Sequence, residues 1–411
     1  MAYQETTVTG YGTRLKGSLK GIVSGIILFI VGTGILWWNE GRTVKTSDAN
    51  KDAFAETTIV NNIATIDNTL NGKMIHASGL ATTKDSLIDP QFNIGVNAIK
   101  LIRTVEYYQW VETEKSEKKD KLGGSEETVT TYRYEKKWVS SPQKSASFKD
   151  PEYRNKNFTV SNIESETFLA ENVAFGAYTL PTFLSKQISG EQLFYVKLPN
   201  ERIQSLNSSV KSVLQSKTQM LEKPYQANGE YVHISSNEIY LGANANDPVV
   251  GDVRITFHKV MPANVTVWAK VINNTFEAYQ CDNGYSVSAL KMGTRSLDRT
   301  FQEEQEDNSS TAWILRLIGV VFIVFGLRGM FGILVILLKV VPFLSDIMSV
   351  GVNLVCILVG LIWSFLIIAI AWIFYRPILA IALLLAAGAL IFFLIKRSKA
   401  NKQESSESNT K

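Results

Sequence analysis

The stretch GIVSGIILFIVGTGILWW, from Gly21 to Trp38, holds eighteen residues without a charged side chain. An α-helix needs about 17–25 predominantly apolar residues to cross a bilayer. Basic residues precede the stretch, as they would in a secretory signal peptide. A signal peptide ends in small residues at its cleavage site, whereas this sequence continues as WWNE. We therefore predict an uncleaved membrane anchor at residues 21–38, after a cytoplasmic N-terminus at residues 1–20.

The C-terminal part of the sequence contains enough apolar residues for three further spans. We predict these spans at residues 312–331, 350–374 and 377–395. The first of them contains Arg316 and Arg328, one towards each end. Because long basic side chains can extend along a helix to the membrane surface, each arginine can reach one face.

Residues 332–349 are apolar but are interrupted by Lys339, Pro342 and Asp346. We predict that this segment is an interfacial helix or a bent re-entry into the third span. A longer, kinked second helix is the alternative, since nothing before Pro342 requires the helix to end.

The distribution of charge predicts the orientation in the membrane. Lys and Arg outnumber Asp and Glu in both short flanks, residues 1–20 and the tail at residues 396–411. By the positive-inside rule both termini are cytoplasmic, which agrees with four spans. Residues 39–311 then form one extracytoplasmic or lumenal domain with 30 basic and 34 acidic side chains. The net charge of +4 is therefore the sum of −4 in this domain and +8 in the rest of the chain. This balance does not predict nucleic-acid binding.

The domain between the first two spans is predicted to be α+β and mostly β. Residues 104–114 and 129–139 alternate with a period of two, as half-buried strands do. We predict that the charged residues 115–127 form a solvated hairpin tip between them. Helical spacing predicts helices at residues 165–184 and 204–217, and a polar helix at residues 296–308 leads into the second span.

The same domain contains a short internal similarity. GKMIHAS at residues 72–78 is followed by GEYVHIS at residues 229–235. Each copy precedes a predicted strand pair, at residues 98–110 and 251–268. A true repeat predicts two pseudo-symmetric β-rich halves, and chance similarity between strands is the alternative.

The sequence offers no recognisable catalytic or metal-binding motif. The histidines are His76, His233 and His258, and they occur in no zinc or hydrolase pattern. Cys281 and Cys356 form no zinc-binding spacing, and Cys356 lies within an apolar run. We therefore expect no enzymatic activity, no catalytic residue, no metal and no cofactor.

Charged and aromatic residues gather where the predicted spans meet the outer membrane surface. Glu40 follows the first span, Arg316 opens the second, and Arg376 joins the third to the fourth. We predict that Glu40 pairs with Arg376 or Arg316 and so fixes the soluble domain against the helices. Ordinary interfacial anchoring by an aromatic belt is the alternative. The belt consists of Trp37, Trp38, Trp313, Trp372 and Tyr375.

Four short motifs, in order along nearly the whole chain, resemble the transmembrane protein 43 family, also called LUMA. They are Asn39-Glu40-Gly41-Arg42, Tyr108-Gln109-Trp110-Val111-Glu112, Val250-Gly251-Asp252-Val253-Arg254 and Phe374-Tyr375-Arg376-Pro377. The resemblance implies four spans, a large lumenal or extracytoplasmic domain, cytosolic termini and no catalytic residues. It also implies self-association. Animal members occupy the endoplasmic reticulum and inner nuclear membrane and are linked to emerin and lamins, and a channel role has been suggested.

The charged loop at residues 115–127 and the polar tail differ from animal members of that family. The sequence also has five glycosylation sequons, at Asn157, Asn207, Asn264, Asn273 and Asn308, and several of them fall in predicted strands. These features favour a bacterial homologue in an inner membrane, and they make emerin and lamins expected partners only of a eukaryotic member.

The leading functional prediction is an oligomerising membrane scaffold that organises protein complexes and contacts membrane lipids. Small residues such as Gly21 with Gly25, and Ala386 with Ala389, favour close helix packing. An ion channel or transporter component is the first alternative, with polar residues lining its path, and a membrane-bound hydrolase or transferase is the second. The residues that would line a channel are Arg316, Arg328, Asn353 and Ser364.

Overall fold

The computed structural model of the chain describes residues 3–337, 342–378 and 381. These residues divide into two compact units. The first, here called the β unit, comprises residues 3–7, 52–118 and 128–302. The second, here called the helical unit, comprises residues 8–51 and 119–127 and the described residues from 303 onwards.

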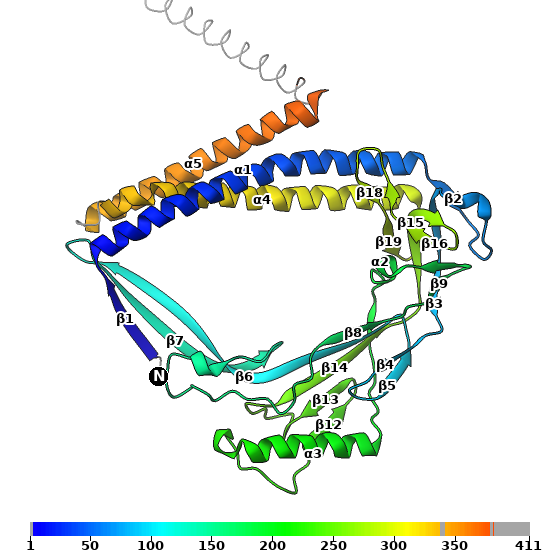
Figure 1. Cartoon of the computed structure of the whole chain (residues 1–411), viewed down its shortest axis with the longest axis horizontal. Coiled ribbons are helices and arrows are strands. Elements are labelled where there is room, and N and C mark those ends of the chain that lie inside the picture. The colour runs from blue at the N-terminus through cyan, green and yellow to red at the C-terminus, as the bar shows by residue number, and fades with distance from the viewer. Residues whose placement is uncertain (1–2, 338–341, 379–380, 382–411) are drawn as a thin grey trace, which may run out of the picture. The chain divides into compact units, whose positions relative to one another are not determined.

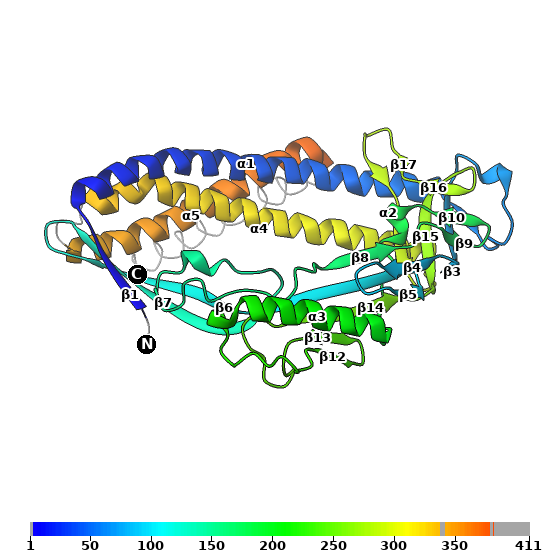
Figure 2. The same cartoon turned by 60° about the horizontal axis from the view of Figure 1, so that its bottom comes forward.

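Three long helices, α1 (Tyr11–Ala55), α4 (Leu297–Leu337) and α5 (Pro342–Tyr375), run side by side in the helical unit (Figures 1 and 2). Each is long and apolar enough to cross a membrane. This confirms one N-terminal and two C-terminal apolar helices. The predicted fourth span, residues 377–395, lies almost entirely outside the described residues.

The helices are longer than the predicted spans. α1 continues beyond Trp38 to Ala55, and residues 39–55 contain no proline that would end it. α4 begins at Leu297, so the predicted polar helix at residues 296–308 leads directly into the second apolar segment, as expected.

Two helices also share the interrupted segment at residues 332–349. α4 extends to Leu337, and α5 starts at Pro342, a residue suited to the first turn of a helix. Residues 338–341 between them lie outside the described part of the chain. The interfacial position of this segment stays a prediction.

The larger sheet has eight strands in the main order β1-β7-β6-β14-β13-β12. Strand β14 pairs antiparallel with β6, placing Val253 opposite Tyr107. Two short strands attach at the side, β8 to β6 and β11 to β14. The strands are β1 (Tyr3–Thr9), β6 (Lys100–Asp120), β7 (Glu126–Val139), β8 (Glu166–Leu169), β11 (Glu191–Leu193), β12 (Val232–Ser235), β13 (Glu238–Leu241) and β14 (Val253–Val260).

The smaller sheet has seven strands in the main order β10-β9-β3-β15-β16. β19 pairs antiparallel with β15, and β2 pairs parallel with β3. Its strands are β2 (Thr58–Val60), β3 (Met74–Thr83), β9 (Val173–Phe175), β10 (Tyr178–Leu180), β15 (Ala263–Ile272), β16 (Thr275–Glu277) and β19 (Ala289–Met292). Two further hairpins are β4 (Ser86–Asp89) with β5 (Ile94–Asn97), and β17 (Tyr279–Gln280) with β18 (Ser286–Val287).

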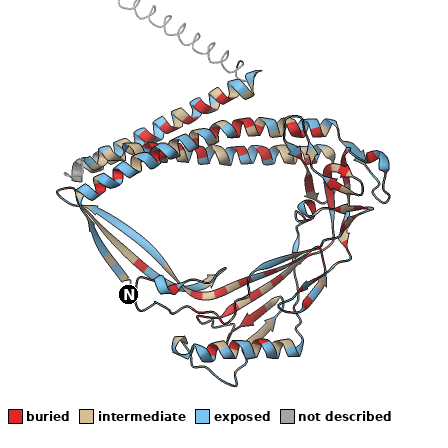
Figure 3. Ribbon diagram, in the orientation of Figure 1, coloured by how far each residue is buried: buried red, intermediate tan, exposed pale blue. Residues whose placement is uncertain are grey.

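Inner faces of both sheets contribute to one hydrophobic core in the β unit. Its largest fully buried side chains include Tyr107, Tyr178 and Phe257, and burying such a side chain stabilises the fold by roughly 1.5–3 kcal/mol. Helix α3 (Asn200–Ser216) buries Leu206, Val210 and Leu214 on one face, and it lies beside β12 and β13 in Figure 2. Figure 3 shows buried residues concentrated along the strands, whereas the long helices carry exposed residues along much of their length.

The predicted hairpin is present, but its tip is shorter than expected. Strand β6 continues to Asp120 and β7 begins at Glu126, so most of the charged residues lie on strands with exposed side chains. Gly123 and Gly124 both have positive φ, near +84° and +82°. Glycine adopts this conformation without steric cost, and it closes the turn.

One prediction about the β unit was wrong, and a second is not shown. Residues 165–184 form no long helix but β8, β9, β10 and the single turn α2 (Thr182–Ser185), because Gly176, with φ near +63°, makes a tight turn between two short buried strands. In the first predicted strand pair, residues 100–110 belong to the single strand β6. In the second, residues 251–268 include β14 and part of β15, which lie in different sheets. The proposed repeat is therefore not shown.

Strand β1 belongs to the same sheet as the strands of the β unit. Gln4 donates a hydrogen bond to the hydroxyl of Thr131, and Glu5 accepts one from Tyr132. A bilayer cannot divide a hydrogen-bonded sheet, because unpaired strand edges are costly in lipid. This pairing places residues 3–7 with the β unit, whereas the charge distribution predicts that they lie across the membrane from it.

Candidate functional site

Glycine residues allow α1 and α4 to pack backbone against backbone. A Cβ atom added to Gly25 would lie 2.6 Å from the carbonyl oxygen of Gly326, and one added to Gly32 would lie 2.8 Å from that of Gly319. One added to Gly329 would lie 2.9 Å from the carbonyl oxygen of Gly21. Successive glycines along α1 therefore meet glycines that come progressively earlier in α4, so the two helices are antiparallel. Close approach through small residues is a common way of packing helices in membranes.

Glu40 lies at the centre of a polar cluster that joins three helices. Its carboxylate is fully buried and accepts hydrogen bonds from Arg316 Nε and Nη2, at 2.7 and 2.9 Å. The indole Nε1 of Trp372 donates to the same carboxylate at 2.8 Å. Because a bidentate guanidinium–carboxylate pair is geometrically specific, the cluster fixes α1, α4 and α5 in register.

Asn39 and its neighbours extend the cluster through side-chain bonds to backbone carbonyls. The Asn39 amide donates to the carbonyl oxygen of Ala312 at 3.0 Å, and the Asn308 amide donates to that of Thr43 at 2.9 Å. Both amides are buried. Arg42 reaches the carbonyl oxygen of Asn308 at 3.4 Å. The Asn-Glu-Gly-Arg motif thus supplies cross-helix partners to α4.

The third motif residue, Gly41, packs against the last turn of α5. A Cβ atom there would lie 2.7 Å from Tyr375 Cζ, so a larger residue would displace the ring. Arg376 does not bond to Glu40. Its guanidinium carbon instead lies over the ring of Trp372, 5.9 Å from the ring centroid. Pro377 follows on the surface. The structure therefore supports Arg316 and not Arg376 as the partner of Glu40.

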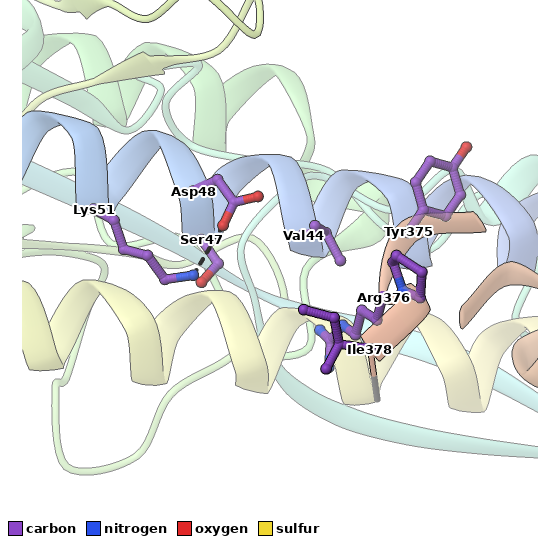
Figure 4. A pocket seen from close by; sticks show the side chains of 8 residues that line it. Val44, Ser47, Asp48, Lys51, Tyr375, Arg376 and Ile378 are labelled. Atoms are coloured by element: carbon purple, nitrogen blue, oxygen red, sulfur yellow. Dashed lines mark hydrogen bonds and ion pairs between the residues drawn. The ribbon is translucent and has the colours of Figure 1, made fainter. Parts of the chain in front are cut away.

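Two cavities in the helical unit border Arg376. One, of about 630 Å³, is lined from α1 and from the end of α5, and in it Lys51 forms an ion pair with Asp48 at 2.9 Å (Figure 4). The other, of about 380 Å³, is bounded by Trp313, Phe365, Ile368 and Trp372 among others. Both lie beside the polar cluster.

The motif residues Tyr108, Gln109, Trp110 and Glu112 occupy β6, in the β unit. Gln109 is almost fully buried and donates to the carbonyl oxygen of Phe158 at 3.1 Å. The ring of Tyr108 contacts that of Trp138, and Trp110 packs edge-on against Tyr153. Glu112 accepts from the hydroxyl of Tyr134 at 2.6 Å. These residues stabilise the sheet and the loop that covers it.

Asp252, from the Val-Gly-Asp-Val-Arg motif, is buried beside β13. Its carboxylate accepts from the hydroxyl of Tyr240 and from the backbone N–H of Val249. Burial raises the pKa of Asp252 to about 6, and the hydrogen bonds from Tyr240 and Val249, with the charge of Lys223, offset only part of this rise. Arg254 points elsewhere, pairing with Glu106 at 2.7 Å and stacking over Trp138. The motif residues thus form two separate groups, one in each unit.

A family model described as Transmembrane protein 43 matches residues 107–377, which include the whole group in the β unit and, in the helical unit, Arg316 and residues 375–377. The chain belongs to the transmembrane protein 43 family.

Curated members of the transmembrane protein 43 family are similar to this chain over most of their length. The rat and human proteins named Transmembrane protein 43 are each 28% identical to it, across 95% of this chain and 92% of their own. The Transmembrane protein 43 homolog of Drosophila melanogaster is 29% identical, across 89% of this chain and 91% of its own. No solved structure matches the chain.

Two histidines of this family member, His76 and His233, have structural partners. His76 Nε2 lies 3.1 Å from the hydroxyl of Thr300, and burial lowers the pKa of His76. His233 Nε2 lies 3.0 Å from the carbonyl oxygen of Gly242. Within the described residues no group of three His, Cys, Asp or Glu side chains could hold a metal ion.

The sequence analysis did not predict several side-chain contacts in this member of the transmembrane protein 43 family. It did not assign the indole of Trp372 to Glu40, the hydrogen bond from Trp363 to Thr33, or the buried pair of Arg103 with Asp89 at 2.6 Å. It also missed the glycines of α4. Their signal was present, since Gly319, Gly326 and Gly329 follow helical spacing on one face.

Proposed function

We propose that this member of the transmembrane protein 43 family is a non-enzymatic membrane scaffold. In this proposal the helical unit anchors the chain and self-associates as a homo-oligomer. The β unit, with its extensive surface, binds other proteins or lipids and so organises a complex.

The observation that carries the proposal is the way the helix contacts are made. The carboxylate of Glu40 is engaged by Arg316 and Trp372, and the closest helix contacts consist of glycine backbone. Such an interior holds helices together and offers little polar surface for a transport path.

The residues considered for a channel support the same proposal. The hydroxyl of Ser364 donates to the carbonyl oxygen of Gly360 within its own helix, at 2.7 Å. Arg328 is exposed on the outside of the bundle and stacks over Phe325 at 5.5 Å. Asn353 is only partly buried.

Exposed apolar side chains on α4 and α5 provide the surface for self-association. Phe325 is 53% exposed, and Leu358 and Ile362 are 51% and 67% exposed. In a bilayer these side chains contact lipid or a second copy. We propose that second copies pack on this surface.

We also place the protein in a bacterial inner membrane. Glycosylation requires an accessible asparagine amide, but the Asn157 amide donates to the carbonyl oxygens of Trp110 and Gln143, and that of Asn308 donates to Thr43. Both asparagine amides are hydrogen-bonded within the fold, as expected of a protein whose sequence was not selected for glycosylation.

Cross-linking in native membranes tests the scaffold proposal. Leu358→Cys places a thiol on the exposed surface, and Ile323→Cys, at a fully buried position of α4, is the matched control. We expect disulfide-linked dimers from Leu358→Cys only, and a multiple of the 45.8 kDa chain mass in nanodiscs. A single chain mass with no cross-link contradicts self-association. Ion flux through protein-containing liposomes that is lost on Arg328→Gln would favour a channel instead.

A further inference from the structure

Arg376 is a cation at the end of a membrane helix. It follows Tyr375, the last residue of α5, and its backbone N–H donates to the carbonyl oxygen of Trp372 at 2.7 Å. Its guanidinium lies over the indole of Trp372. Among residues 3–337, 342–378 and 381, no carboxylate forms an ion pair with Arg376, because the nearby Glu40 is bonded to Arg316.

The surroundings of Arg376 are two cavities with mainly apolar walls. The cavity of about 380 Å³ extends from Arg376 along Trp372, Ile368 and Phe365. The cavity of about 630 Å³ contains Lys51, but this ammonium is paired with Asp48 (Figure 4). Of the cations that line the two cavities, Arg376 is the one left without a carboxylate partner within the described part of the chain, and it borders both cavities.

We propose that Arg376 binds the phosphate of an anionic phospholipid, with one acyl chain of that lipid in the groove along α5. A guanidinium presents a fork of N–H donors that matches phosphate oxygens. Basic pockets between membrane helices bind lipid headgroups. Phe365 and Arg376 are eleven residues apart, which is about 16 Å along a helix and comparable with a large part of an acyl chain.

The position of the groove favours a membrane phospholipid over a soluble phosphate. Trp313 and Tyr375 each line one of the two cavities that Arg376 borders, and such aromatic residues mark the boundary between headgroups and hydrocarbon. A soluble anion would leave the apolar wall of Phe365 and Ile368 uncovered, whereas an acyl chain covers it.

Native mass spectrometry of the full-length protein tests this proposal. The probes are phosphatidylglycerol, phosphatidylcholine and inorganic phosphate, each added separately. We expect phosphatidylglycerol adducts on the wild type at several times the level of phosphatidylcholine adducts. Arg376→Gln should weaken phosphatidylglycerol binding about fivefold, which corresponds to one basic contact near a membrane surface.

Three further variants separate the site from general charge and from misfolding. Arg328→Gln removes another guanidinium that stacks on an aromatic ring, and it should leave binding unchanged. Ser309→Trp fills the groove from an exposed position and should lower binding although Arg376 remains. Arg376→Lys keeps the charge and should bind at an intermediate level.

Several results would overturn the proposal. These are equal binding of phosphatidylcholine, unchanged binding by both Arg376→Gln and Ser309→Trp, an equal loss in Arg328→Gln, or displacement of phosphatidylglycerol by millimolar inorganic phosphate. None of these outcomes depends on the number of chains in the particle, so the scaffold proposal is tested separately.

Discussion

The helical unit and the β unit each bury a carboxylate from a family motif, but they satisfy it differently. Glu40 in the helical unit faces the guanidinium of Arg316 and the indole of Trp372. Asp252 in the β unit faces a phenol and a backbone N–H, both neutral. Glu40 is therefore held by an ion pair, and loss of either partner leaves a buried charge without a counter-charge. Asp252 can instead be neutralised by binding a proton.

Breaking the ion pair should have the largest effect. Glu40→Gln leaves Arg316, whose side chain is 13% exposed, without its counter-charge. Removing one partner of a buried pair costs about 3–5 kcal/mol. We expect hydrogen–deuterium exchange of the detergent-purified variant to show opening of α1 and α4 before the strands.

Two controls sharpen this prediction. Arg376→Gln removes an arginine that does not touch Glu40, so exchange in α1 should stay as in the wild type. Glu40→Leu with Arg316→Leu removes both charges, and it should restore most of the lost stability. If Arg376→Gln opens the helices as much as Glu40→Gln does, the assignment of the pair is wrong.

Disturbing the glycine packing should have the next largest effect. Gly25→Ala adds a Cβ atom that meets backbone atoms of α4 at 2.6 and 2.8 Å, so the helices must separate. Overpacking of this kind costs about 1–3 kcal/mol. Gly34→Ala is the matched control, since nothing lies within 4 Å of its added Cβ. Thermal unfolding should show a lower midpoint for Gly25→Ala alone, and equal midpoints would contradict the close packing.

Protonation of Asp252 should change the stability of the β unit by a smaller amount than the two substitutions change that of the helical unit. The pKa of Asp252 is about 6 in the folded chain and near 3.8 when unfolded, so the folded state binds the extra proton between these values. Its contribution to stability is therefore present below the unfolded pKa and is lost as pH rises through 6. Between pH 5 and pH 7 this amounts to about 1 kcal/mol.

Asp252→Asn tests the pH dependence, because it keeps an acceptor for Tyr240 without the titration. We expect denaturant unfolding to show that the stability difference between variant and wild type changes by this amount from pH 5 to pH 7. A constant difference would show that Asp252 does not titrate in this range.

Chemical labelling tests whether β1 lies on the same side of the membrane as the β unit, and it requires no measurement of stability. Gln4→Cys lies in β1 and Lys118→Cys lies in the exposed part of β6. Since β1 shares a sheet with β7 and β6, we expect a membrane-impermeant maleimide to label both from the same side. Labelling from opposite sides would show that β1 leaves the sheet in the membrane and that the charge distribution is the better guide.

Local patterns predicted the apolar helices and the hairpin because both depend on neighbouring residues. The length of β6 was underestimated because its charged end, up to Asp120, has exposed side chains and no alternation. The partner of Glu40 remained open, since Arg316 and Arg376 were both placed at one level. Only the packing of α1 on α4 and α5, between segments far apart in sequence, decides between them.

The long separation between Glu40 and Arg316, 276 residues, also has a consequence for biosynthesis. Chains grow at about 5–20 residues per second, so Arg316 is made roughly 14–55 s after Glu40. During this interval α1 has neither its counter-charge nor its glycine partner. The unfinished chain must therefore hold an unmatched carboxylate at the membrane surface, where water or the insertion machinery can solvate it until the second helix arrives.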